Sequence, residues 1–325
     1  MLKKLNKKST HRKAGIFCLI AISFMVVQWV IFYLLMHLNS IVLAFKYFDP
    51  TKGVNGDMVY LPFNSLLTNF KAFVGDLFNE PNITRYFFNG ALFHLVALVA
   101  MPLSLMVAYV IVKKLPATGF FKVILFLPHV ISSMILALMF RYVSLNAFRG
   151  IWTNIFHKPY NDFPALLVTD KYAFGTLLVY QFFFAIPGSL LINLGTMSRV
   201  PTEIIESGKL EGISYFREFI NIYIPLMFPV LQVYLLGMFV GFFTAQGPLY
   251  AIYGSGASTK IYLPDNAKSL GYYMFVSATA DTGGADKRYM YGYTAAANLL
   301  IGVVSVPIVY ITKLILDKFD PGAEF

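Results

Sequence analysis

Charged residues are scarce in this chain, and its longest apolar runs contain none. Asp, Glu, Lys and Arg make up 13% of the 325 residues, while hydrophobic residues make up 58%. A typical soluble globular domain carries about 25% charged residues. The balance therefore excludes an ordinary soluble domain and indicates a membrane protein.

Cysteine and the common catalytic motifs are also nearly absent. The single cysteine, Cys18, excludes a disulfide framework, and its apolar surroundings indicate a small core or lipid-facing residue. No G-x-x-x-x-G-K-[ST] phosphate loop, HExxH or CxxC occurs, and the five histidines follow no metal-ligand spacing. We therefore expect no metal and no cofactor in this chain. A membrane-embedded enzyme has little support, because buried carboxylates and nucleophile–base pairs are missing as well.

Six apolar runs are long enough to cross a bilayer, which takes roughly 20 helical residues each. They are residues 14–45, 89–112, 123–140, 172–198, 219–245 and 289–312, and their 152 positions hold no Asp, Glu, Lys or Arg. The third run is the shortest. We predict an all-α membrane protein, a bundle of six transmembrane helices.

The basic residues predict the orientation of this bundle. With the N-terminus inside, the inner segments total 56 residues and hold 14 Lys or Arg, whereas the outer segments total 117 residues and hold 12. Both termini are therefore expected in the cytosol, and the net charge of +10 reflects this bias rather than nucleic-acid binding. The expected organisation is a basic tail at 1–13, a transmembrane domain at 14–318 and a cytosolic tail at 319–325.

Two of the outer segments are sizeable loops, at 46–88 and 246–288. Each contains a short apolar or amphipathic stretch, at 66–73 and 270–276, that is too short to span a membrane. We predict an interfacial helix in each loop. The loops either contact an extracellular partner or cap the bundle.

A charged, turn-rich segment lies on the predicted cytosolic side. Residues 199–229 have the sequence RVPTEIIESGKLEGISYFREFINIYIPLMFP. Charges of both signs alternate along two helical patterns that are broken at Gly208 and Gly212. The pattern predicts a short helix, a tight turn and a second helix. Such an element is either a docking surface for a soluble partner or a solvated connector.

The polar side chains within the apolar runs are uncharged amides, imidazoles and hydroxyls among many aromatic rings. This combination suits a neutral, hydroxyl-rich solute such as a sugar, although a single polar residue in a span more often joins two helices. Ion-coupled carriers usually hold ionisable groups in the membrane, where they are costly and functional. We therefore expect the energy for transport to arrive through the cytosolic segment from another subunit.

The cytosolic segment resembles the signature loop of permease subunits of binding-protein-dependent ABC importers, specifically the sugar-type, maltose-type branch. That signature has Glu-Ala-Ala, a following Asp-Gly and a later Leu-Pro. The corresponding residues are Glu206 at the glutamate, Ser207 and Gly208 at the alanines, Glu211 and Gly212 at Asp-Gly, and Ile224 and Pro225 at Leu-Pro. Stretches 43–53, 89–115 and 123–140 are similar to the same branch, and Gram-positive oligosaccharide and polysaccharide permeases are the most alike.

The resemblance implies a bacterial cytoplasmic-membrane complex with several partners. These are a second, homologous permease, two copies of a cytosolic ATPase that binds Mg-ATP, an extracellular solute-binding protein and membrane lipids. The loop at 199–225 would dock in a groove of the ATPase, with Glu206 partnered there and Gly212 permitting the turn. This chain would be a transport subunit without enzymatic activity.

The same resemblance implies candidate substrate contacts in three spans. They are His129, Ser133, Gln181, Phe184 and Phe242, with Thr244 and Gln246 as nearby substitutes, because Phe242 stands where the family has an asparagine. The implied function is import of a carbohydrate, an oligosaccharide, by alternating access. The alternative from another functional class is a stand-alone channel or facilitator for a neutral solute.

Overall fold

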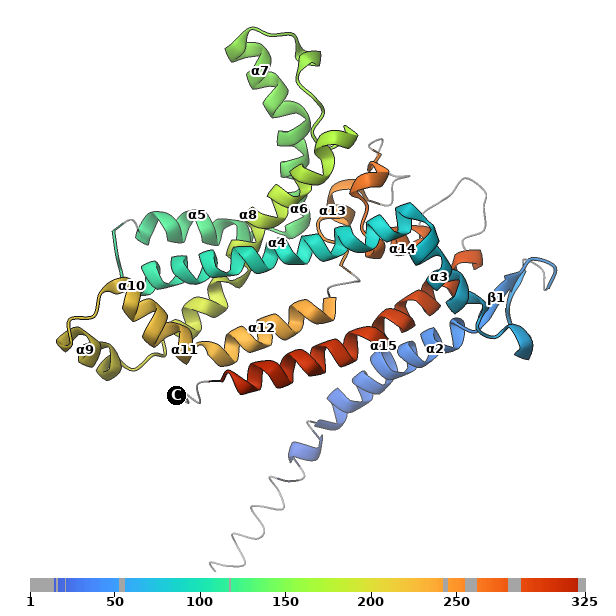
Figure 1. Cartoon of the computed structure of the whole chain (residues 1–325), viewed down its shortest axis with the longest axis horizontal. Coiled ribbons are helices and arrows are strands. Elements are labelled where there is room, and N and C mark those ends of the chain that lie inside the picture. The colour runs from blue at the N-terminus through green and yellow to red at the C-terminus, as the bar shows by residue number, and fades with distance from the viewer. Residues whose placement is uncertain are drawn as a thin grey trace, which may run out of the picture. The chain divides into compact units, whose positions relative to one another are not determined.

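The structure, a computed structural model, describes residues 15, 17–20, 22–52, 56–116, 118–241, 245–254, 262–279 and 288–320, without the side chains of residues 129, 288 and 289. It is mostly helical, as predicted (Figure 1). Contacts within the chain divide it into two units. Unit 1 is Met1–Phe73 with Arg288–Leu299, and unit 2 is Val74–Lys287 with Leu300–Phe325.

Several helices are long and apolar enough to cross a membrane. Five are single helices: Phe17–Leu43, Pro81–Val112, Ser133–Phe156, Asp170–Met197 and Met290–Lys318. A sixth is a bent pair, Tyr215–Leu226 with Phe228–Gly241. By length and composition, the described residues therefore hold five candidate spans, or six if the bent pair is one span, and the chain is a multi-pass membrane protein.

In unit 1 the first span is uncovered by the rest of the unit. It includes the π-helical turn η1 (Val30–Leu34) and α2 (Leu35–Leu43), and none of the described residues from Phe17 to Leu43 is buried. Cys18 is exposed there, as a lipid-facing residue would be.

A small antiparallel hairpin follows the first span, which the all-α prediction did not include. β1 (Lys46–Asp49) pairs with β2 (Asp57–Tyr60), with Lys46 opposite Tyr60. Aromatic residues in both strands, and Val59 in β2, favour this structure. Hydrogen bonds from Thr51 hold the pKa of Asp49 below its ordinary value.

The predicted stretch at 66–73 does form a helix, and Asn69 fixes it within unit 1. A 3-10 turn, η2 (Phe63–Ser65), precedes α3 (Thr68–Asn79). Asn69 Nδ2 donates to the carbonyl oxygens of Ala44, at 2.9 Å, and Lys46, at 3.0 Å. Gly292 leaves room for these bonds, because a Cβ at Gly292 would lie 2.2 Å from the Lys46 oxygen and 2.7 Å from Asn69 Nδ2.

Two long helices form the axis of unit 2. α4 (Pro81–Val112) and α8 (Asp170–Met197) pack along one another, and both contain an internal proline. Polar side chains join them in the buried interface: Ser189 Oγ donates to Ser104 Oγ at 2.8 Å, and Asn193 Nδ2 donates to the same oxygen at 3.1 Å. Polar bonds between spans are common where lipid offers no hydrogen-bond partner.

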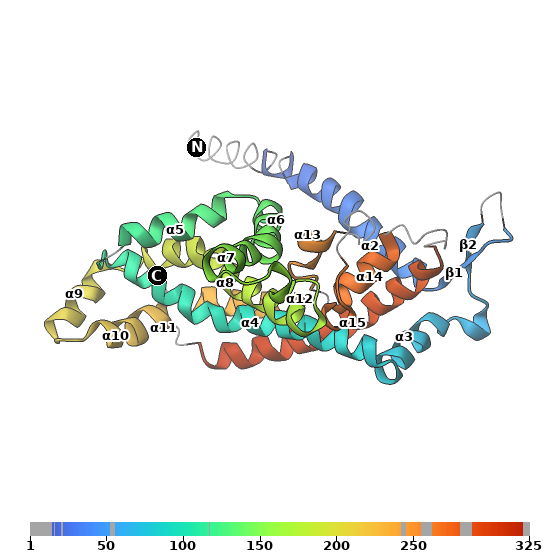
Figure 2. The same cartoon turned by 90° about the horizontal axis from the view of Figure 1, so that it is seen from above.

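The predicted third span, 123–140, is interrupted in the structure. α5 (Thr118–Val130) ends, and α6 (Ser133–Tyr142) begins after Ser132, whose backbone is non-helical at φ −53° and ψ 133°. Serine is a common N-cap residue, although the Ser132 side chain makes no capping hydrogen bond here. The helix continues through η3 (Val143–Ala147) into α7 (Phe148–Phe156), which projects from the rest of unit 2 in Figure 1 and is seen end-on in Figure 2. A 3-10 turn, η4 (Tyr160–Asp162), follows it.

The predicted fifth span, 219–245, is bent. After α9 (Thr202–Leu210) and α10 (Tyr215–Glu218) come the π-helical turn η5 (Phe219–Tyr223), α11 (Ile224–Leu226) and α12 (Phe228–Gly241). The chain bends by 70° between α11 and α12. Pro225 and Pro229 flank this point, and each removes a backbone N–H that a straight helix would use.

The segments after α12 fold back onto unit 2. α13 (Leu249–Tyr253), η6 (Asp265–Ala267) and α14 (Leu270–Thr279) precede the last helix, α15 (Arg288–Lys318). The predicted stretch at 270–276 is helical, as α14, but Leu270, Tyr272 and Met274 are buried. α14 is therefore packed into the unit rather than lying with a free interfacial face.

We predict that Gly292→Ala destabilises the protein while Gly302→Ala, on the same helix, does not. A methyl group at 292 displaces Asn69 and costs hydrogen bonds worth about 1–3 kcal/mol if the carbonyls stay unsatisfied. No atom lies within 4 Å of a Cβ at Gly302. Thermal unfolding in detergent measures the difference, and equal melting temperatures would contradict the close approach.

Candidate functional site

The clearest candidate site is the helix–turn–helix of residues 202–218, which we call the knuckle. It consists of α9, the turn at Glu211–Ser214 and α10. Figures 1 and 2 both show it at the end of unit 2 opposite α14. The predicted order of short helix, tight turn and second helix is confirmed.

Local sequence explains where α9 begins and how its charges are placed. Pro201 precedes the first turn with a non-helical backbone, at φ −57° and ψ 136°. Glu203 lies in the first turn and Lys209 in the last. Both charges complement the helix dipole, which favours an anion at the N-terminus of a helix and a cation at its C-terminus.

The turn after α9 is a Schellman motif that requires Gly212. Ile213 N–H donates to Gly208 O at 3.1 Å, and Gly212 N–H donates to Lys209 O at 3.0 Å. Gly212 has φ +73°, a left-handed conformation that costs an L-residue with a Cβ roughly 1–2 kcal/mol. The sequence-based break at Gly212 is therefore correct.

The break expected at Gly208 is wrong, because Gly208 lies within α9 and is buried. A Cβ at Gly208 would lie 3.1 Å from Ile222 Cδ1 and 3.2 Å from Ile213 Cγ2. Both contacts are tighter than ordinary van der Waals contact. Glycine here lets α9 approach its own turn and the following helix closely, which holds the knuckle compact rather than loosening it.

The outer surface of the knuckle combines charges with large apolar side chains. Glu206, Ser207 and Glu211 are all exposed. Leu210 is 90% exposed and Phe216 is 65% exposed. Exposed apolar groups beside charges mark interaction surfaces.

The base of the knuckle contains a buried ion pair that the sequence analysis missed. Lys113, at the C-cap of α4, pairs with Glu218, the last residue of α10. Neither residue was given a role from the sequence. The available signal was that each residue lies immediately beside an apolar run.

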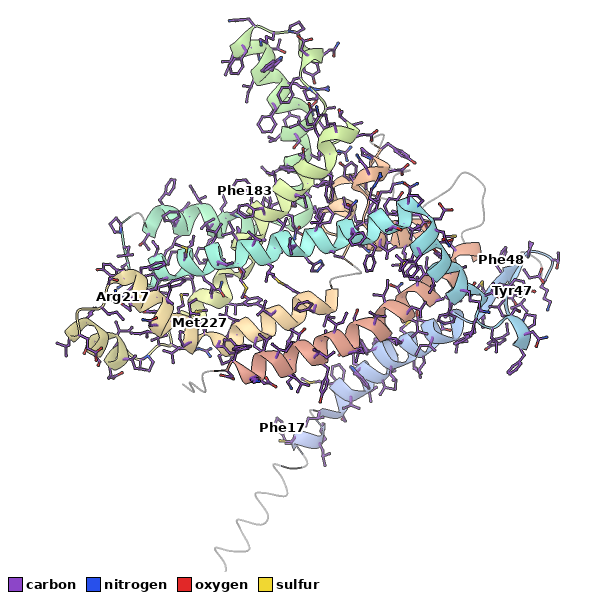
Figure 3. The ribbon with its side chains drawn as sticks, viewed as in Figure 1. Phe17, Tyr47, Phe48, Phe183, Arg217 and Met227 are labelled. Atoms are coloured by element: carbon purple, nitrogen blue, oxygen red, sulfur yellow. The ribbon has the colours of Figure 1, made fainter. Side chains whose placement is uncertain are left out.

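Pro225, the last signature residue, lies after η5 and just before the 70° bend. Figure 3 labels Arg217, just before Glu218, and Met227, at the bend.

The predicted substrate residues lie in three parts of unit 2. His129 is in α5, with its side chain outside the described residues, and Ser133 is exposed at the start of α6. Gln181 and Phe184 are half-buried in α8, and Gln246 is half-buried before α13. Phe242 and Thr244 lie outside the described residues. The structure thus brings Gln181 and Phe184 to one helix, a single turn apart.

Phe184 belongs to an aromatic group that joins α8 to α6. Its ring centroid is 4.4 Å from that of Tyr180, which is 4.8 Å from that of Phe140. Gln246 precedes Gly247, where a Cβ would come 3.4 Å from the ring of Phe93 on α4, and Phe93 packs in the same apolar cluster as Tyr180 and Phe184. Among the residues with described positions, no group of three His, Cys, Asp or Glu could hold a metal ion.

Comparison with known proteins gives relatives of one kind, although no family model matches the chain. A probable starch degradation products transport system permease protein of Thermoanaerobacterium thermosulfurigenes is 23% identical over 215 residues, 65% of this chain and 68% of that protein. The trehalose/maltose transport system permease protein of Thermococcus litoralis is 28% identical over 184 residues, 54% of this chain and 61% of that protein.

A solved structure has the same fold over nearly its whole length. It is a bacterial alginate ABC transporter in complex with an alginate pentasaccharide-bound periplasmic protein. The TM-score is 0.68 at 16% identity, covering 95% of this chain and 96% of that one. The resemblance to sugar-type permeases, first seen in the knuckle, is confirmed by these relatives, whose names describe them as transport system permease proteins.

We predict that Gly208→Leu detaches α9 from the rest of unit 2. The larger side chain must displace Ile213 and Ile222, and such overpacking costs about 1–3 kcal/mol. Hydrogen–deuterium exchange at the amides of 203–210 should accelerate. Ser207→Ala, at an exposed neighbouring position, is the matched control, and unchanged exchange in Gly208→Leu would rule out the close approach.

Proposed function

We infer that this chain is the permease subunit of a binding-protein-dependent ABC importer of the sugar type, which carries a carbohydrate across the cytoplasmic membrane of a bacterium. The observation that carries this inference is the knuckle. A compact helix–turn–helix with exposed apolar and charged residues stands at one end of an apolar bundle. The relatives are named as transport system permease proteins for starch degradation products and for trehalose and maltose.

The proposed topology has six spans with both termini in the cytosol. α5 with α6 would form the third span, and the bent segment from α10 to α12 the fifth. The transmembrane domain would extend over 14–318, between cytosolic tails at 1–13 and 319–325. Support comes from the excess of Lys and Arg in the inner segments, and this topology puts the knuckle in the cytosol.

Energy would enter through the knuckle from a separate ATPase. Two ATPase copies, each binding Mg-ATP, would serve this chain and a second, homologous permease. Glu206, Ser207 and Glu211 would face the docking groove, while Leu210 and Phe216 lose their exposed apolar surface in it. Closure of the ATPases then tilts the knuckle, and the bundle alternates between inward and outward openings. An external solute-binding protein delivers the substrate, as the periplasmic protein in the alginate complex suggests.

The proposed substrate path runs beside α8. Phe184 and Tyr180 offer apolar ring faces, and Gln181 offers an amide one turn away. A sugar ring has apolar CH faces between hydroxyl groups, so stacking and hydrogen bonding can act together. His129, Ser133 and Gln246 would add polar contacts, with Phe242 and Thr244 beside Gln246 in sequence. The names of the relatives favour an oligosaccharide.

We predict that Gln181→Leu raises the half-saturation concentration for uptake by about 2- to 10-fold, because a neutral hydrogen bond contributes about 0.5–1.5 kcal/mol. Uptake of labelled maltodextrin or alginate oligosaccharide into cells measures this. Thr196→Val is the control, since the Thr196 hydroxyl bonds within its own helix. An unchanged half-saturation concentration would remove Gln181 from the path.

We predict that Leu210→Asp lowers co-purification of the ATPase by at least about tenfold, because burying a leucine contributes about 1.5–3 kcal/mol. The measurement is pull-down of the tagged chain from native membranes. Phe63→Asp is the control, because Phe63 is 88% exposed and lies in η2, far from Leu210 in the sequence. Equal ATPase recovery from both variants would argue against docking at the knuckle.

A further inference from the structure

The ion pair at the base of the knuckle is buried to an unusual degree for a surface loop. The side chain of Lys113 is 10% exposed and that of Glu218 is 2% exposed. The other ion pair among the described residues, Lys268 with Asp265, has its carboxylate 60% exposed. Desolvating two charges is costly, and an apolar pair of similar size often gives equal or greater stability. Stability alone therefore gives no reason for charges here.

Aromatic side chains enclose the ion pair and connect it to both helices. The Lys113 ammonium lies 5.9 Å from the ring centroid of Tyr109 and 5.7 Å from that of Tyr223. Tyr109 OH donates to Tyr215 O at 3.0 Å, and its ring centroid lies 5.2 Å from that of Phe219. α10 and η5 are thus fixed to the last turn of α4.

The end of α4 is itself built to hold Lys113 in place. Leu115 N–H donates to Val110 O at 3.2 Å, and Lys114 N–H donates to Ile111 O at 3.2 Å. This is a second Schellman motif, with Lys114 in the left-handed conformation at φ 52°. Lys113 therefore occupies a fixed C-cap position at the end of the helix that packs along α8.

The knuckle has few other attachments to the bundle. α9 contributes buried Gly208 and half-buried Ile205, and its remaining residues are largely exposed. Within the described residues, Glu218 makes the one ion pair between the knuckle and a spanning helix. A displacement of the knuckle can reach the bundle by two routes: through the connection from α8, where Val200 is buried, and through α10. The ion pair lies on the second route, at the junction of α10 with α4.

We propose that the Lys113–Glu218 pair is a coupling strut, which transmits displacement of the knuckle to α4 and, through the buried interface, to α8. A directional bond between two charges resists both separation and sliding, whereas an apolar contact of the same volume lets the helices slide. Both residues are positioning residues and neither contacts substrate. The proposal rests on the proposed function and adds to it the route by which the ATPase moves the spans.

The test uses the whole complex, purified and reconstituted with its ATPase, with sugar transported per ATP hydrolysed as the readout. Lys113→Met/Glu218→Met removes the bond without leaving a buried unpaired charge. Lys113→Glu/Glu218→Lys restores the attraction in reverse. Lys114→Gln is the matched control, because it removes the neighbouring exposed charge.

The expected result is a specific loss of coupling. The apolar pair retains thermal stability and ATPase capture, but sugar transported per ATP falls by at least about fivefold, the lower end of coupling between sites. The reversed pair recovers most of the loss, and Lys114→Gln has no effect.

Three outcomes would overturn the strut. The apolar pair could couple as well as the wild type, the control could lose as much coupling, or both double variants could fail to fold, which would make the pair a requirement for stability. Failure of the proposed function is separate, since the wild-type complex would then show no ATP-dependent uptake.

Discussion

The bilayer's intolerance of unpaired charge is the constraint on which this structure depends. A charge or an unsatisfied peptide group in hydrocarbon costs several kcal/mol or more, so charges gather at helix ends or in pairs. The six apolar runs contain no Asp, Glu, Lys or Arg. Any work done on the bundle must therefore be applied at its ends, where the charged segments lie. In the described part of the chain, one such end is the knuckle, with its own two short helices and the turn between them.

The end of unit 2 that carries the knuckle has well-defined helix ends, whereas two of its candidate spans are bent or interrupted. Two Schellman motifs, at Gly212 and Lys114, fix the helix ends on either side of the ion pair. The fifth span bends by 70° beside Pro225, and the third is interrupted at Ser132. A rigid element attached to hinged spans can convert a small displacement into a change between two packed arrangements.

Much of the fold could be predicted because its causes are local. The apolar runs identify most of the spanning helices, and Gly212 marks a left-handed turn that other residues enter at a cost. The helix break predicted at Gly208 was wrong, because the role of Gly208 depends on its contact with Ile222, which lies on a different helix. The same limit applies to Ser132 and to the 70° bend, where proline and serine indicate irregularity but tertiary packing determines its direction.

The ion pair shows this limit most clearly. Lys113 and Glu218 lie 105 positions apart, and their one local signal, a position beside an apolar run, does not distinguish a buried charge from a solvated one. The β-hairpin after the first span was also missed, because four-residue strands leave a weak alternating pattern. By contrast, the signature loop indicated the function before the fold, because its short spacing reflects a single local motif.

The most direct test of the central claim is transport in proteoliposomes with defined sources of energy. We expect uptake of maltodextrin or alginate oligosaccharide against its gradient only when the chain is assembled with its permease and ATPase partners and supplied with Mg-ATP. The chain alone should give no flux, with or without a proton or sodium gradient. Uptake by the chain alone, passive or driven by an ion gradient, would contradict the account.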